Sequence, residues 1–64
     1  MIRLNGVERP WSGGTVRSLL DDLALDGRGV AVALDGEIVS RRDWERTAVT
    51  EGCVVDVVTA MAGG

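Results

Sequence analysis

The chain has 64 residues, a formal net charge of −3, one cysteine and no histidine. This length allows one domain with a small core. A single cysteine cannot form a disulfide within the chain. The lack of histidine excludes Ser-His-Asp and Cys-His catalysis and argues against a His/Cys metal site. The composition therefore argues against an independent enzyme and predicts no bound metal.

The charged residues exclude two further classes of protein. All seven basic residues are arginines, and they stand against ten acidic residues without forming a basic cluster. We expect no nucleic-acid binding, because the phosphate backbone requires an excess of positive charge. No apolar run approaches the roughly 20 residues of a membrane span, and residues 1–6 lack the apolar stretch of a signal peptide. The expected location is the cytoplasm, with a reduced thiol and no membrane partner.

The N-terminal segment predicts a β-hairpin. Residues 2–4 alternate apolar and polar side chains, as a half-buried strand does. Asn5-Gly6 is typical of a two-residue type I′ turn, and residues 7–11 form the expected return strand. Pro10 cannot donate a hydrogen bond to a neighbouring strand, so we expect this strand to lie at an edge or to end there.

The next segment predicts one amphipathic helix. Thr15 is a good N-cap residue, and apolar residues follow it at helical spacing. These residues are Val16, Leu19, Leu20 and Leu23. Gly27 and Gly29 come after this stripe and suit the C-terminal exit of a helix.

A second hairpin is predicted after the helix. Residues 30–34 are apolar and rich in β-branched side chains, which is typical of a central strand. Asp35-Gly36 is a second hairpin turn signal, and residues 37–39 form the expected return strand.

The last part of the chain predicts a short helical turn and a final strand. Ser40 is expected to cap a turn over residues 41–46, and Trp44 is expected to pack this turn onto the core. Glu51-Gly52 indicates a further turn. Residues 53–60 then form the strongest strand pattern in the sequence.

Three short patterns admit a functional interpretation, which we weigh against a structural one. Ser12-Gly13-Gly14 lacks the lysine and the remaining residues of a phosphate-binding loop, so we interpret it as a turn. Asp21-Asp22 has no nearby residue to complete a metal or acid–base site, and Arg41-Arg42 is an isolated basic pair that could bind an anion. We interpret both pairs as solvated surface.

The order of these elements predicts an α+β fold. Strands in two groups around one helix form a roll, and the first and last strands can pair in parallel at the sheet centre. This arrangement is the β-grasp, or ubiquitin-like, fold: a mixed sheet of four to five strands with one main helix packed on one face. We expect residues 1–64 to form a single domain, with residues 61–64 as a flexible reactive tail.

The C-terminal end carries the first functional feature. Gly63 and Gly64 have no Cβ atom, so their backbone can extend into a narrow channel. Met61 and Ala62 precede them, and an end with so little to pack is expected to be mobile. The carboxylate of Gly64 is therefore predicted to be a reachable group that a partner enzyme can activate.

The final strand carries the second functional feature, because its side chains alternate between two faces. Val55 and Val57 are expected to point toward the helix. The central strand is expected to turn Val30, Val32 and Leu34 the same way. The other face has no covering element and is predicted to dock a partner; self-association, or a strand that is simply apolar on both sides, is the alternative. Its residues are Ala31, Ala33, Val54, Asp56, Val58 and Ala60.

With these features the chain resembles the thiamine-biosynthesis sulfur carrier family (ThiS) of the ubiquitin fold, over nearly its whole length. Ser40 and Cys53 depart from the family pattern, which usually has a proline and an acidic residue at these positions. The landmarks of the resemblance are, in order, Asn5-Gly6, Thr15-Val16, Leu19-Leu20, Val30-Ala31-Val32-Ala33, Ile38-Val39, Arg41, Trp44, Glu51-Gly52 and Gly63-Gly64.

The resemblance implies a sulfur carrier for thiazole formation in thiamine biosynthesis. A partner resembling the ubiquitin-activating enzymes would adenylate the carboxylate of Gly64, with ATP and magnesium belonging to that adenylyltransferase. A sulfur donor such as a cysteine desulfurase would displace AMP and leave a thiocarboxylate. Thiazole synthase would then take the sulfur. The carrier itself is expected to bind no cofactor and to hold no catalytic residue.

Two other functions fit the same residues. One is sulfur delivery to molybdopterin, cysteine or a siderophore, with the same chemistry at Gly64. The other is a β-grasp interaction module that never uses its tail. Cys53 is the only thiol side chain, and we expect it to be a small apolar filler, because no histidine or lysine accompanies it to activate the thiol.

Overall fold

The computed structural model describes residues 1–59 as five strands, one α-helix and one 3₁₀ helix. Their bounds are β1 (Ile2–Leu4), β2 (Val7–Arg9), α1 (Val16–Asp22), β3 (Val30–Leu34), β4 (Glu37–Val39), η1 (Arg41–Asp43) and β5 (Val54–Thr59). Ala60 and the predicted tail, residues 61–64, lie outside the described residues. No helix in the described part of the chain is long and apolar enough to cross a membrane.

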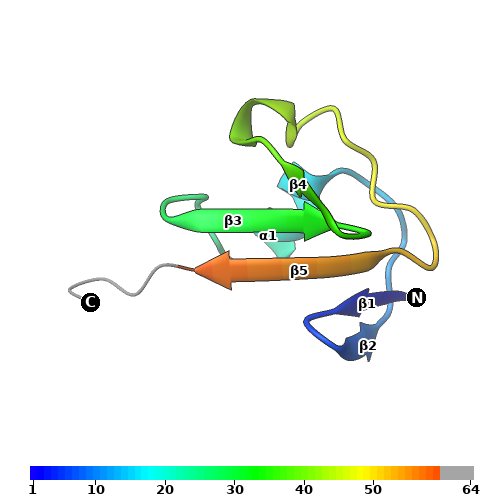
Figure 1. The fold of residues 1–64 in the computed structure, drawn as a ribbon. Coiled ribbons are helices and arrows are strands. Elements are labelled where there is room, and N and C mark those ends of the chain that lie inside the picture. The colour runs from blue at the N-terminus through cyan, green and yellow to red at the C-terminus, as the bar shows by residue number, and fades with distance from the viewer. Residues whose placement is uncertain (60–64) are drawn as a thin grey trace.

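The strands form one mixed sheet in the order β2-β1-β5-β3-β4 (Figure 1). β1 and β5 pair in parallel, with Arg3 opposite Val54 and Leu4 opposite Val55. The other pairs in this sheet are antiparallel. The predicted β-grasp arrangement is therefore confirmed, with the first and last strands side by side, β2 next to β1, and the β3–β4 hairpin next to β5.

Both hairpin turns have the positive φ angles of a type I′ turn, which was predicted for Asn5-Gly6. The φ angles are +50° and +82° along Asn5-Gly6, and +50° and +87° along Asp35-Gly36. The first hairpin is shorter than predicted, since β2 ends at Arg9 and does not reach residue 11. The reason is Pro10, which has no N–H to continue the ladder, and β2 accordingly lies at the sheet edge.

Side chains of the two turns also hold β5. Asn5 donates from Nδ2 to the carbonyl of Val57 (3.1 Å) and accepts at Oδ1 from the N–H of Val57 (2.8 Å). Asp35 accepts at Oδ1 from the N–H of Val54 (2.9 Å), and its own N–H donates to the carbonyl of Val54 (2.7 Å). These bonds tie β5 to the hairpins on both of its sides and thereby fix its register.

The helix begins at Thr15, as predicted. Thr15 Oγ1 accepts a hydrogen bond from the N–H of Ser18 (3.2 Å), and Ser18 Oγ accepts one from the N–H of Thr15 (2.8 Å). This reciprocal pair is a capping box, which satisfies two N–H groups at the start of the helix. The apolar stripe then faces the sheet, where Val16, Leu19 and Leu20 are fully buried.

The C-terminal end of the helix differs from the prediction. The residue in the left-handed conformation is Ala24, with φ +60°, and no glycine of residues 27–29 closes the helix. The N–H of Ala24 donates to the carbonyl of Asp21 (3.0 Å), and the N–H of Leu25 donates to the carbonyl of Leu20 (2.9 Å). These are the two bonds of a Schellman motif, formed here around an alanine.

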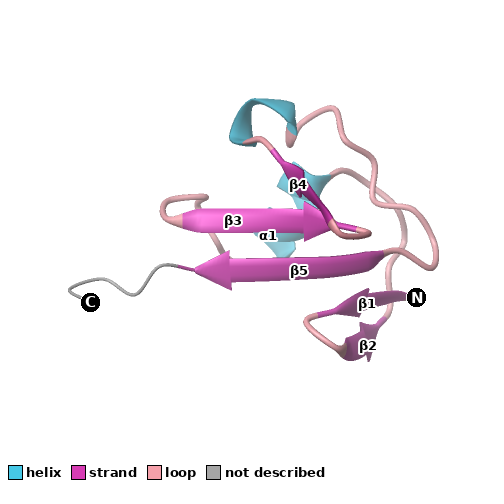
Figure 2. Ribbon diagram, in the orientation of Figure 1, coloured by secondary structure: helices cyan, strands magenta, loops and turns pink. Residues whose placement is uncertain are grey.

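The core lies between α1 and one face of the sheet. Figure 2 shows α1 crossing behind β3 and β5, which leaves the opposite face of these two strands without a covering element. The buried residues are Ile2, Val16, Leu19, Leu20, Val32, Trp44, Val49, Cys53 and Val55. The predicted one-sided packing of the sheet is therefore confirmed.

The segment after β4 confirms the predicted helical turn in part. It forms a 3₁₀ helix over Arg41–Asp43 that is shorter than the predicted 41–46, and Ser40 stands before it without a side-chain capping bond. The backbone of Ser40, with φ −63° and ψ 144°, has the extended geometry that proline also adopts. Trp44 packs into the core as predicted, and its Nε1 donates to the carbonyl of Val39 (3.0 Å).

Replacing Ala24 with glycine should stabilise the fold. A Cβ atom in the left-handed region costs about 1–2 kcal/mol, and the greater entropy of glycine in the unfolded chain offsets part of that gain. We expect a net increase of about 1 kcal/mol in the free energy of unfolding, which raises the melting temperature of a small domain by roughly 4–8 °C. Thermal unfolding followed by circular dichroism measures this change.

Ala31→Gly is the matched control for this substitution. Ala31 is also exposed, but it lies within a strand, where glycine should lower the melting temperature. A melting temperature that rises in both variants, or that falls in Ala24→Gly, would contradict the role assigned to Ala24.

Candidate functional site

The described residues of the predicted docking face lie on the sheet face opposite α1. Along β5, Val55 is buried and Val57 is half-buried against the core, so the residues that alternate with them point away from the helix. The exposed ones are Val54, Asp56 and Val58. Ala60, which was also predicted for this face, lies outside the described residues.

The pairing register of β3 and β5 places the alanines of β3 beside these residues. Ala31 is opposite Val58, and Ala33 is opposite Asp56, so both pairs point to the same side of the sheet. Ala31 is exposed, but Ala33 is only half-buried and contributes less surface than predicted. Together they form a surface of small apolar side chains around a single carboxylate, which we call the open face.

The open face extends to a residue that the sequence analysis did not include. Ile38 of β4 is opposite Ala33 in the register, and 75% of its surface is exposed. It is the bulkiest apolar side chain on this face. Because Ala33 is opposite both Ile38 and Asp56, all three side chains point to the same side of the sheet. The alternation in residues 37–39 was the available signal, because Val39 packs against the core and its neighbour must point the other way.

The opposite margin of the open face is charged. Arg3 of β1 lies opposite Val54 of β5 and opposite Glu8 of β2, and its guanidinium is 3.6 Å from the Glu8 carboxylate. Within residues 1–59, Asp56 makes no ion pair. The face thus has an apolar centre with one carboxylate, and an ion pair at its rim, which is the usual distribution at a protein–protein interface.

The end of β5 sets where the C-terminal residues begin. Thr59 is opposite Val30 at the start of β3, at the end of the sheet away from the N-terminus (Figure 1). Gly64, the predicted site of attachment, lies outside the described residues. So do Met61, Ala62 and Gly63, which were predicted to form the tail.

Cys53 lies in the core and away from the open face. Only 7% of its surface is exposed, and it packs among the buried apolar residues. Its Sγ atom is 3.3 Å from the N–H of Thr50 and 3.1 Å from the Thr50 hydroxyl. This position agrees with the structural role expected from the sequence.

The other polar patterns do not gather at the open face. Asp21 pairs with Arg17 on the helix surface (3.0 Å). Arg41 and Arg42 line a surface pocket with residues from α1 and the turn after η1. Among residues 1–59, no group of three or more acidic or cysteine side chains is arranged to hold a metal ion.

Comparison with known proteins gives a consistent family. The model of the ThiS family matches residues 2–64. The sulfur carrier protein ThiS of Thermus thermophilus is 36% identical over 64 residues, and the match covers 100% of both chains. A thiazole synthase of Paramagnetospirillum magneticum is 39% identical over 62 residues, which make up 95% of this chain and 19% of that protein.

Solved structures of the same kind match the whole fold. The crystal structure of a thiamine biosynthesis protein (ThiS) from Geobacter metallireducens has a TM-score of 0.84 at 28% identity, covering 98% of this chain and 97% of that chain. An NMR structure of a thiamine biosynthesis protein from the same organism has a TM-score of 0.80, also at 28% identity, and covers 98% of this chain and 86% of that one. The chain therefore belongs to the ThiS family and is a sulfur carrier of thiamine biosynthesis.

Proposed function

We propose that this carrier holds sulfur on the terminal carboxylate of Gly64. An ATP-dependent adenylyltransferase, which supplies the ATP and magnesium site, joins AMP to the carboxylate and releases pyrophosphate. The terminal sulfur of a cysteine-desulfurase persulfide then attacks the carbonyl carbon, and AMP leaves. A thiol cleaves the resulting S–S bond and leaves a thiocarboxylate on the carrier, which acts as a substrate of these enzymes and not as a catalyst.

The observation that carries this proposal is the position of β5 between β1 and β3. The strand is held at the sheet centre and ends at Thr59, five residues before Gly64. Five residues span at most about 18 Å when extended. This length can bring a terminal carboxylate into an enzyme active site while the folded part of the carrier stays on the enzyme surface.

The acceptor that we propose is thiazole synthase, with the reaction in the cytoplasm. A protein of that name contains a segment 39% identical to 95% of this chain. That a thiazole synthase contains a carrier-like segment in its own chain supports the proposal that carrier and synthase work together. The carrier supplies the sulfur of the thiazole ring, and its own surface needs no cofactor.

The open face is the proposed docking surface for these partners. It presents two exposed valines, Val54 and Val58, together with Ile38, without a covering element from the chain itself. Apolar surface of this kind is stabilised when a partner removes it from water. The carboxylate of Asp56 lies among these residues, and we expect the partner to place a cation against it, since a charge without a partner is costly to bury.

The intact C-terminus should gain sulfur when the carrier is incubated with ATP, its activating enzyme and a sulfur source. Mass spectrometry should detect the mass increase for the replacement of one oxygen by sulfur, localised to Gly64. A variant that lacks Gly63 and Gly64 should show no such increase, with an unchanged melting temperature. If the intact chain never gains this mass with its cognate activating enzyme, the proposed chemistry at Gly64 is wrong.

Val58→Glu should weaken docking to thiazole synthase at least tenfold, because it places a second carboxylate beside Asp56 in the interface. Val7→Glu is the matched control. Val7 is a strand valine of equal exposure, 66% against 63% for Val58, but it lies on the edge strand β2 outside the open face. Isothermal titration calorimetry with the synthase measures both affinities. Equal losses in the two variants would remove the open face from the interface.

Cys53→Ala should retain sulfur transfer to within about twofold, because the carrier chemistry occurs at Gly64 and the thiol is buried. The substitution removes one sulfur atom from the core and should lower the free energy of unfolding by about 1 kcal/mol. Single-turnover formation of the thiocarboxylate, measured below the melting temperature, separates the two effects. Loss of transfer in a folded variant would assign Cys53 a chemical role.

A further inference from the structure

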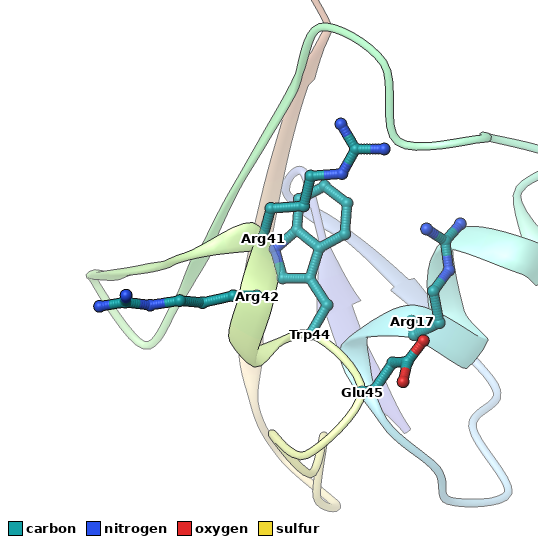
Figure 3. A pocket seen from close by; sticks show the side chains of 5 residues that line it. All are labelled: Arg17, Arg41, Arg42, Trp44 and Glu45. Atoms are coloured by element: carbon teal, nitrogen blue, oxygen red, sulfur yellow. The ribbon is translucent and has the colours of Figure 1, made fainter.

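A surface pocket of about 620 Å³ lies beside η1, separate from the open face. It is lined by Arg17, Arg41, Arg42, Trp44 and Glu45 (Figure 3). Arg17 comes from α1, and the other residues come from η1 and the turn that follows it. Three cationic side chains and one carboxylate therefore meet at a place where two elements of the fold converge.

The indole of Trp44 organises this pocket. Trp44 as a whole is 2% exposed, and its Nε1 already donates to the carbonyl of Val39 (3.0 Å). The guanidinium of Arg17 is 5.7 Å from the ring centroid, and that of Arg41 is 6.0 Å from it, within the range of cation–π attraction. Figure 3 shows both arginines beside the indole, whereas Arg42 extends away from it.

The two arginines at the indole differ in their other partners. Arg17 donates to Asp21 Oδ1 (3.0 Å) and to the carbonyl of Leu25 (2.8 Å), which holds its side chain in place. Within residues 1–59, Arg41 makes no ion pair. A guanidinium that lies near a buried ring and has no ion-pair partner among these residues can bind an oxyanion through its planar N–H groups.

The pocket also limits which oxyanion it takes. Trp44 is buried and two guanidinium groups lie near its ring, so it offers no open aromatic face for the base of a nucleotide. Glu45 and the net charge of −3 oppose a free polyanion such as phosphate. A single carboxylate on a docked protein carries less negative charge than a phosphate dianion, so Glu45 and the net charge of the carrier repel it less.

The location of the pocket indicates which protein presents that carboxylate. Val39 of β4 is opposite Val32, so the chain that continues to Arg41 runs toward the end of the sheet where Val30 pairs with Thr59. The loop at that end also touches the pocket: a Cβ atom on Gly27 would lie 2.8 Å from Cζ3 of Trp44. The pocket and the start of the C-terminal residues thus share one end of the molecule.

We propose that Arg41, supported by Trp44 and Arg17, binds a carboxylate side chain of the enzyme that activates the C-terminus. The inference rests on the proposed function, because an enzyme that takes in the residues after Thr59 must approach this end of the sheet. The pocket is then a second, electrostatic contact, separate from the apolar open face. It sets the affinity of the carrier for the activating enzyme and leaves the chemistry at Gly64 unchanged.

The experiment compares Arg41→Gln with Arg42→Gln, its neighbour on the same 3₁₀ helix. ATP-dependent thiocarboxylate formation is followed by mass spectrometry while the carrier concentration is varied. Arg41→Gln should raise KM for the carrier about tenfold with kcat within twofold, and Arg42→Gln should change neither by more than twofold. Arg41→Lys keeps the charge but loses the planar fork, so its KM should lie between those of wild type and Arg41→Gln.

Two controls separate this contact from a structural role and from a small-anion site. Raising the ionic strength should raise KM of the wild type more steeply than KM of Arg41→Gln, because the variant lacks the screened charge. The indole N–H signal of Trp44 should not shift on titration with inorganic phosphate up to millimolar concentration. Saturable phosphate binding there, or equal KM values for the Arg41 and Arg42 variants, would overturn the proposal.

The same assay distinguishes the two levels of inference. If wild-type carrier forms no thiocarboxylate, the proposed function itself fails. If wild type and both glutamine variants form it with the same KM, the carrier function stands and the assignment of the pocket is wrong.

Discussion

Asn5 and Asp35, each the first residue of a type I′ turn, bond to the backbone of β5 from opposite sides. The rest of the structure depends on this restraint, because β5 lies at the sheet centre between β1 and β3. A slip of one residue would expose Val55 and direct Asp56 into the core. The register of β5 therefore decides at once which side chains build the core and which form the open face.

The chain presents two separate surfaces, the open face and the arginine pocket beside η1. With α1 on one side of the sheet, nothing in the described chain covers the other side, and β5 exposes Val58 there. The second surface lies next to Trp44. This residue is buried in the core, and the guanidinium groups of Arg17 and Arg41 lie near its ring. One surface is apolar and the other is cationic. A carrier that reacts at its terminus, as we propose for this one, needs only such surfaces and a rigid sheet between them.

Most of the fold could be predicted, because its signals are local. The two turns require positive φ at specific residues, and the cap at Thr15 depends on Ser18, three residues away. The errors occur where the backbone departs from the preference of the residue type. Ala24 takes a conformation that favours glycine, because two hydrogen bonds to the last turn of α1 hold it there. Ser40 makes no cap, because its extended backbone leads directly from β4 into η1.

The sequence by itself determined the pattern of alternation on β5, the turn chemistry and the Gly63-Gly64 pair, since each is a property of consecutive residues. It also indicated the open face, and the β3–β4 register then placed Ile38 on that face opposite Ala33. The tertiary structure alone decided the arginine pocket. Arg17 and Arg41 belong to separate elements, and no spacing along the chain places both beside one indole. Their proximity follows from packing α1 and η1 around Trp44, which is a consequence of burying that ring in the core.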